Sequence, residues 1–171
     1  GSGGKSGIKK AKIFNVKVPY GHTSTILKDT AVMEEDSDGL LAVGGDLSIS
    51  ALITAYSMGI FPWFSDGSPI LWWSPNPRLV LFPEKFKISS SLRQKKNSRK
   101  YTVTIDTCFT SVIAHCSGIK RTGQEGTWIT KEMYDAYVDL HVHGLAHSFE
   151  TWHNGELAGG LYGVSLGRAF F

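Results

Sequence analysis

The sequence predicts an α+β protein, because segments with the spacing of helices and segments typical of strands both occur along its 171 residues. Apolar residues recur at helical spacing after Ser48 and again after Thr130, and both residues favour the N-cap position of a helix. Residues 146–152 alternate like a strand, Asn154-Gly155 predicts a hairpin turn, and residues 157–166 would form the return strand. We therefore expect helices and a β-hairpin in the same chain.

Weaker signals predict further helices and strands. Asp106 is expected to cap a helix that Gly118 closes, and residues 79–82 are expected to form a short buried strand. Residues 168–171 are typical of a strand that has only begun. We therefore expect the sequence of the protein to continue beyond Phe171.

The segment 59–78 is stiff and aromatic. It holds Trp63, Trp72, Trp73 and four prolines. Proline fixes φ and removes a hydrogen-bond donor, so we expect irregular backbone here rather than a helix or a central strand. Tryptophans on such a backbone either meet a ligand or fasten a loop to the core, and the sequence leaves both open. A second glycine-rich turn sets Trp128 in a similar position.

The composition is that of a globular protein, with 42% hydrophobic and 19% charged residues. This excludes an intrinsically disordered chain, and no apolar run is long enough to span a bilayer. No signal peptide is visible, and Cys108 and Cys116 are expected to be reduced, buried thiols. These features predict a cytoplasmic protein that does not associate with membranes. Residues 1–7 are expected to be a vector remnant or a disordered terminus.

A basic run is the clearest charge signal. Between residues 85 and 100 the chain carries seven of its eighteen basic residues and no acidic one. Such a cluster either contacts nucleic acid phosphates or forms a solvated face. Exposed tryptophans can stack on unpaired bases, so the run together with Trp63 and Trp128 indicates a flexible RNA end more than a duplex.

The histidines do not predict a metal site. His141 and His143 would face different sides of a helix, and no cysteine joins them and His147. His147, Ser148 and Glu150 do not form a catalytic triad, because neighbouring strand residues face opposite sides. The glycines of the return strand lack the spacing of a phosphate loop and are expected to let a ligand or another backbone approach closely.

Several long blocks of the chain closely resemble one family, the bacterial leucyl/phenylalanyl-tRNA–protein transferases. The resemblance runs from about residue 39 to residue 171, and the blocks are long, ordered and rare. They are Gly39 to Leu47, Gly59 to Phe64, Ile70 to Arg78, Glu125 to Thr130, Ala146 to Ser148 and Leu157 to Gly163.

The resemblance implies an enzyme that takes leucine or phenylalanine from Leu-tRNA or Phe-tRNA. The amino acid is attached to the N-terminal Lys or Arg of an acceptor protein, which is thereby marked for degradation. The implied fold is a small N-terminal α+β domain, residues 1–74, followed by a GNAT-like acyltransferase domain, residues 75–171, truncated at its C-terminal side. No metal or cofactor is implied, and a monomer is expected.

The resemblance also implies site residues. Trp63 and Trp128 match tryptophans that hold the terminal adenosine of the tRNA. Leu161 and Phe170 match positions that line the pocket for the donor side chain; the family often has methionine at the first of these. The basic stretch matches the tRNA grip, with Arg93 at a basic position of the family and the others placed only by neighbourhood: Lys95, Lys96, Arg99 and Lys100.

Two other functions remain as alternatives. One is an RNA 3′-end-binding module without transferase activity. The other is a CoA-dependent acetyltransferase, which is disfavoured because no glycine-rich pyrophosphate turn precedes Phe171.

The family places its proposed catalytic carboxylate and neighbouring amide beyond the position of Phe171. The catalytic residues are therefore expected outside this sequence, and residues 1–171 alone should not transfer leucine from charged tRNA to a peptide with an N-terminal Arg. Robust transfer of labelled leucine by residues 1–171 would contradict this expectation.

Overall fold

A computed structural model describes residues 12–14, 30–32, 39–118 and 129–171. The order of helices and strands confirms the α+β prediction. The elements are β1 (Lys12–Phe14), β2 (Thr30–Val32), β3 (Leu40–Gly44), α2 (Ile49–Ser57), β4 (Phe61–Pro62), β5 (Leu71–Trp73), β6 (Arg78–Val80), the 3₁₀ turn η1 (Pro83–Lys85), α3 (Ser90–Asn97), β7 (Tyr101–Ile105), α4 (Phe109–Gly118), α5 (Lys131–Val142), β8 (Ala146–His153), β9 (Glu156–Leu166) and β10 (Ala169–Phe170).

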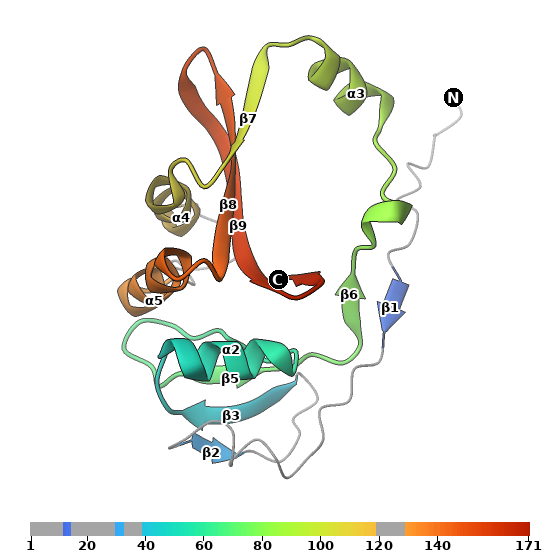
Figure 1. The fold of residues 1–171 in the computed structure, drawn as a ribbon. Helices are drawn as coiled ribbons and strands as arrows, with labels where there is room; N and C mark the ends of the chain where they lie inside the picture. The colour runs from blue at the N-terminus through green and yellow to red at the C-terminus, as the bar shows by residue number, and fades with distance from the viewer. Residues whose placement is uncertain (1–11, 15–29, 33–38, 119–128) are drawn as a thin grey trace, which may run out of the picture.

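The strands form two four-stranded sheets and one two-stranded pair. The first sheet has the order β2-β3-β5-β4, the second has the order β10-β9-β8-β7, and β1 pairs with β6. All of these pairings are antiparallel. Helices α4 and α5 lie on one side of the second sheet, and α2 lies between that sheet and the first one (Figure 1). The second sheet therefore keeps one face free of helices in the part of the chain that the structure describes.

The helix caps at Ser48 and Thr130 confirm the sequence prediction. The Ser48 hydroxyl accepts the Ala51 N–H at 3.3 Å, and the Thr130 hydroxyl accepts the Met133 N–H at 3.2 Å. The predicted cap at Asp106 is wrong. Helix α4 begins only at Phe109, and the Asp106 carboxylate instead accepts hydrogen bonds from strand β8.

The prediction of irregular backbone between residues 59 and 78 is wrong in part. Strand β5 is an interior strand, because it pairs with β3 on one side and β4 on the other. The prolines do not prevent this pairing, because β5 itself contains no proline and lies between Pro69 and Pro75. Pro62 lies in β4, which is an edge strand, where a missing N–H costs no ladder hydrogen bond.

The hairpin of β8 and β9 confirms its prediction in detail. Asn154 and Gly155 both have positive φ, at 53° and 82°, as a type I′ turn requires. Gly163 of β9 lets another backbone approach, as expected: a Cβ placed there would lie 2.2 Å from the Phe171 carbonyl oxygen. Residue 163 must therefore be glycine for β10 to fold back onto β9.

Two burial predictions are wrong. Strand β6 is not buried, because Leu79 and the following Leu81 are 72% and 66% exposed. Among the described strands it pairs only with β1, so it is not part of either four-stranded sheet. Cys108 and Cys116 are free thiols, as expected, but each is partly exposed rather than buried. Cys116 packs against the core from α4, and Cys108 lies just before that helix.

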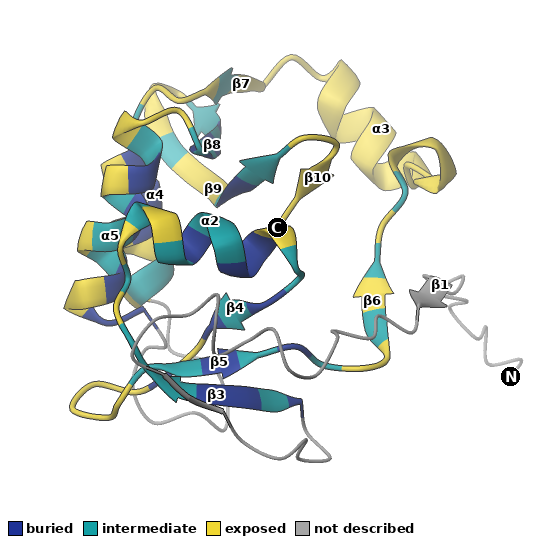
Figure 2. Cartoon of the chain, turned by 60° about the horizontal axis from the view of Figure 1, so that its bottom comes forward, coloured by how far each residue is buried: buried dark blue, intermediate teal, exposed yellow. Residues whose placement is uncertain are grey.

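The core joins the two sheets through α2 and α5 (Figure 2). Leu52 of α2, Trp72 of β5, Ile113 of α4, and Met133 and Leu140 of α5 are all fully buried. Burial of such side chains supplies most of the stabilising free energy, at about 1.5–3 kcal/mol for each side chain of the size of leucine.

One polar contact crosses this core. The Tyr56 hydroxyl on α2 is hydrogen-bonded to the Tyr137 hydroxyl on α5, and both side chains are almost fully buried. Burial raises the pKa of Tyr56 to about 12, so this phenol stays protonated at neutral pH. The pair therefore fixes the position of α2 relative to α5 without placing a charge in the core.

The tyrosine pair predicts a distinctive mutational pattern. Tyr56→Phe or Tyr137→Phe alone leaves one buried hydroxyl without its partner and should lower the free energy of unfolding by about 1–3 kcal/mol. The double variant removes both hydroxyls and should lie close to wild type. Urea unfolding of the four proteins measures this, with the exposed Tyr101→Phe as the matched control. Additive losses in the double variant would contradict the proposed pairing.

Candidate functional site

Trp63 is held on the sheet edge with its ring partly open to solvent. Its backbone N–H donates to the Leu71 carbonyl at 2.9 Å, and its own carbonyl accepts the indole N–H of Trp73 at 2.7 Å. The Trp63 and Trp73 ring centroids are 6.1 Å apart, and Trp63 is 44% exposed. Because Trp73 holds this segment in place and part of the Trp63 ring is exposed to solvent, the ring is suited to stacking on a flat ligand.

The neighbouring Trp72 has the other role that the sequence left open. It is fully buried, and its indole N–H donates to the Gly44 carbonyl at 2.9 Å. Trp72 therefore fastens β5 to β3, while Trp63 faces outward from the same segment. The predicted partner Trp128 lies outside the described residues.

Leu161 and Phe170 come together on the helix-free face of the second sheet. Leu161 pairs with Phe149 across β9 and β8, and the Phe149 and Phe170 ring centroids are 5.8 Å apart in an edge-to-face arrangement. Phe170 also covers Gly163, where an added Cβ would lie 2.6 Å from its ring. Leu161 and Phe170 remain 52% and 48% exposed. Sequence reasoning missed Phe149, although it is two residues from His147 on the same strand face.

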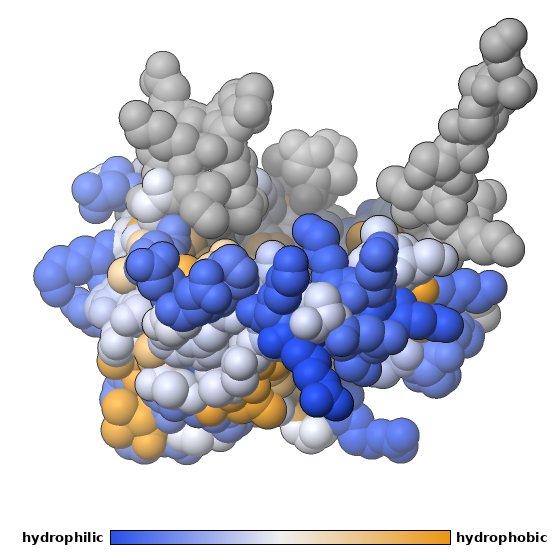
Figure 3. All heavy atoms as spheres, turned by 90° about the horizontal axis from the view of Figure 1, so that it is seen from above, coloured by the Kyte–Doolittle hydropathy of each residue, from blue (hydrophilic) through white to orange (hydrophobic). Residues whose placement is uncertain are grey.

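The basic residues form an exposed surface on and after α3. Every residue from 83 to 103 is exposed, and α3 has no buried side chain (Figure 2). Figure 3 looks down on this end of the molecule, where the most hydrophilic side chains gather. Ser89 caps the helix by accepting the Leu92 N–H at 3.2 Å. The surface holds five predicted tRNA contacts, which are Arg93, Lys95, Lys96, Arg99 and Lys100.

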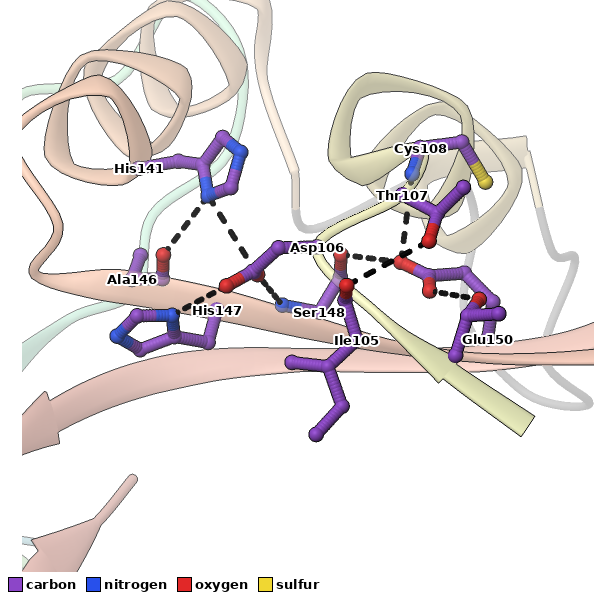
Figure 4. A network of polar contacts seen from close by, with 10 residues as sticks. Ile105, Asp106, Thr107, Cys108, His141, Ala146, His147, Ser148 and Glu150 are labelled. Carbon is purple, nitrogen blue, oxygen red and sulfur yellow. Dashed lines mark hydrogen bonds and ion pairs between the residues drawn. The ribbon is translucent and has the colours of Figure 1, made fainter.

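A buried carboxylate organises the inner side of the second sheet (Figure 4). Glu150 is fully buried and accepts hydrogen bonds from the Ser148 hydroxyl at 2.5 Å and the Thr104 hydroxyl at 2.6 Å. The Cys108 N–H lies 3.5 Å from the same carboxylate, and the Trp152 indole donates to Thr104 at 2.8 Å. Burial would raise the pKa of Glu150, but these donors outweigh it and lower the pKa.

A second carboxylate lies at the end of β7. The Asp106 oxygens accept the Ser148 N–H at 2.9 Å and the His147 Nδ1–H at 2.7 Å, and His141 Nδ1 lies 3.7 Å away (Figure 4). Burial would raise the pKa of Asp106, but the hydrogen bonds from His147 and Ser148 lower it. Asp106 therefore ties the end of β7 to the start of β8 and fixes the tautomer of His147.

The two carboxylates share Ser148 but bond different side chains, and this fits the rejection of a catalytic triad. The Ser148 hydroxyl donates to Glu150, whereas the His147 ring bonds Asp106. The sequence did contain a signal for Glu150, because the alternation from Ala146 places it on the buried side. It contained none for Asp106, which is 41 residues from His147.

Neither a metal centre nor a membrane helix is found in the described ranges. In residues 39–118 and 129–171, no group of three or more His, Cys, Asp or Glu side chains is arranged to hold a metal ion. None of the helices in the described part of the chain has the length and apolar character that a bilayer crossing requires.

Two family descriptions match the chain in sequential order. The N-terminal domain of leucyl/phenylalanyl-tRNA protein transferase matches residues 45–76, and leucyl/phenylalanyl-tRNA protein transferase matches residues 80–171. The second match alone covers more than half of the 171 residues. The chain belongs to this family. The resemblance found in the sequence blocks is thereby confirmed.

Curated relatives agree with the family assignment. The chain is 60% identical over 135 residues to a leucyl/phenylalanyl-tRNA–protein transferase of Desulfatibacillum aliphaticivorans, covering 79% of the chain and 58% of the relative. Proteins of the same name match from Chromobacterium violaceum, with 58% identity, 78% of the chain and 57% of the relative, and from Myxococcus xanthus, with 57%, 80% and 58%. The chain thus spans a little under three fifths of the length of these relatives.

The Glu150 network predicts a pH-dependent stability. A lowered native pKa means that ionised Glu150 stabilises the fold above its unfolded-state pKa of about 4.3, and that this contribution is lost as pH falls through the native pKa. Glu150→Gln should therefore lower the free energy of unfolding by about 1–3 kcal/mol at pH 7, and the difference from wild type should shrink below about pH 4.

Urea unfolding of both proteins between neutral and acidic pH measures the effect. The matched control is Glu156→Gln, which removes the same charge from the exposed end of the hairpin and should change little at any pH. A difference between Glu150→Gln and wild type that stays constant down to the lowest pH would show that ionisation of Glu150 is not the stabilising factor.

Proposed function

We propose that the whole protein is an aminoacyltransferase that moves leucine or phenylalanine from charged tRNA to the N-terminal Lys or Arg of acceptor proteins. The observation that carries this proposal is the family match over residues 80–171, together with relatives 57–60% identical that bear this name. Addition of Leu or Phe would mark the acceptor for degradation.

The site residues keep the roles that the resemblance implies. Trp63 stacks on the terminal adenosine together with Trp128, and the open ring of Trp63 against Trp73 supports this role. Leu161 and Phe170 line the donor side-chain pocket, and their common apolar face with Phe149 supports it. An apolar wall distinguishes Leu from Phe only weakly, since one methylene contributes about 1–3 kcal/mol.

The tRNA body is gripped by the basic surface on and after α3. Arg93, Lys95 and Lys96 project from one short helix, and Arg99 and Lys100 follow it before β7. Full exposure leaves these cations available to phosphates, and each contact releases counterions from the RNA.

The reaction is attack by an amine on an aminoacyl ester, which needs orientation, a proton acceptor and stabilisation of the oxyanion. Residues 1–171 would supply orientation through the adenosine platform, the side-chain pocket and the basic surface. The proton acceptor and the oxyanion donors would lie in the part of the relatives' length that this chain does not span. No metal or cofactor takes part in this proposal.

The remaining proposals concern architecture and setting. The division into an N-terminal domain, 1–74, and a GNAT-like acyltransferase domain, 75–171, is supported by the two separate sheets and by the helices on one face of the second. We place the enzyme in the cytoplasm, where charged tRNA is found, as a monomer without membrane contact.

The test is transfer of labelled leucine from Leu-tRNA to a peptide with an N-terminal Arg, using the full-length protein. Base stacking on one aromatic ring contributes about 1–3 kcal/mol, so Trp63→Ala should lower kcat/KM by roughly tenfold or more. Trp63→Phe keeps a stacking ring and should retain most of the activity, which separates stacking from a purely structural effect.

Three outcomes are informative. Transfer that falls in both Trp63→Ala and Trp128→Ala supports the transferase and the adenosine platform. Transfer that is unchanged in Trp63→Ala rejects the platform. Binding of charged tRNA without any transfer by the full-length wild type would reject the transferase in favour of an RNA 3′-end-binding module.

A further inference from the structure

Arg78 brings a positive charge to the aromatic cluster around Trp63. It is the first residue of β6 and is half-buried. Its guanidinium carbon lies 5.6 Å from the centroid of the Phe61 ring, and its Nη2–H donates to the Gly59 carbonyl. Phe61 and Trp63 are two residues apart along an extended segment, so both face the same side at a separation of about 7 Å.

No carboxylate neutralises this charge within the described residues. The ion pairs found there join other side chains, namely Lys131, His141, His143 and His147, to aspartates. Burial lowers the pKa of Arg78, and its interaction with Tyr56 offsets the effect only in part. Arginine nevertheless stays protonated, so a partly desolvated cation faces this cluster without an anion.

The surroundings of Arg78 also point toward both proposed subsites. The guanidinium contacts Phe61, which shares a face with the platform residue Trp63. Arg78 is also close enough to Tyr56 for an electrostatic interaction, and the Tyr56 ring centroid is 5.2 Å from that of Phe171, the residue after the pocket residue Phe170.

We propose that Arg78 binds the phosphodiester on the 5′ side of the terminal adenosine that stacks on Trp63. The inference rests on the proposed function, because it takes the tRNA end as the ligand. A guanidinium matches two phosphate oxygens with parallel N–H donors, and one Nη2–H on Gly59 leaves other donors for this. Strand β6 then leads toward α3, so the phosphate site and the basic surface follow one path (Figure 1).

The experiment compares two small probes on the full-length protein. One is the dinucleotide CpA, and the other is the same dinucleotide with an uncharged methylphosphonate linkage. Wild type should bind CpA about tenfold more tightly, as expected for a charge-assisted hydrogen bond. Arg78→Gln should bind both probes equally, with its affinity for the uncharged probe unchanged. Lys131→Gln, which removes an exposed charge that is paired with Asp135, should keep the wild-type preference.

Each other outcome overturns the assignment in a recognisable way. Equal loss of both probes in Arg78→Gln would mean that Arg78 only supports the fold. A preference for CpA that survives in Arg78→Gln would place the phosphate elsewhere. Failure of wild type to bind either probe, even though Trp63 is intact, would reject Arg78 as the phosphate ligand together with the adenosine platform, whereas the transferase itself is tested separately by the leucine-transfer assay.

A measurement on the wild-type protein covers the case in which Arg78→Gln does not fold. The Nε–H NMR signal of Arg78, assigned by its absence in Arg78→Lys, should shift on addition of CpA and stay in place with the uncharged probe. Equal shifts with both probes would overturn the phosphate contact.

Discussion

The position of α2 determines how the rest of the molecule is arranged. This helix contacts β4 of the first sheet and β9 of the second, and its Tyr56 reaches the hydroxyl of Tyr137 in the buried core. The hydrogen bond is directional in a way that the surrounding apolar contacts are not, so it fixes the rotation of α2 as well as its distance from α5. Helix α2 therefore helps to hold β4, which precedes Trp63, relative to β9, which pairs with the β10 strand of Phe170.

The residues of the proposed tRNA-end site come from separate parts of the fold. Trp63 follows β4, Arg78 begins β6, and Phe170 lies in β10 near the end of the chain. None of these residues is positioned only by the residues next to it in the sequence. Each is presented by a strand whose pairing holds the backbone, and α2 holds the two sheets together. A rigid support of this kind lowers the conformational entropy that binding would otherwise cost.

Local signals explain which elements the sequence could predict. Ser48, Thr130 and Asn154-Gly155 act within a few residues, so a helix cap or a hairpin turn can be recognised from the sequence alone. The interior position of β5 could not be recognised in this way. The many prolines around it argue against a central strand, and its partner β3 lies about thirty residues earlier in the sequence. Of the candidate site, Leu161 and Phe170 were predicted from the resemblance, while Phe149, Asp106 and Arg78 emerge only from contacts across the fold.

The polar, exposed helix α3 and the apolar face of the second sheet would give tRNA binding two different thermodynamic signatures. Because Leu92 is the only apolar side chain of α3, RNA contact there would remove little apolar surface from water and would change the heat capacity of binding very little. Its contribution would come from counterion release and would fall steeply with ionic strength. The apolar face formed by Leu161, Phe149 and Phe170 would respond in the opposite manner, with a heat-capacity change and little sensitivity to salt. Ionic strength would therefore adjust how long any tRNA stays bound without altering which amino acid is selected.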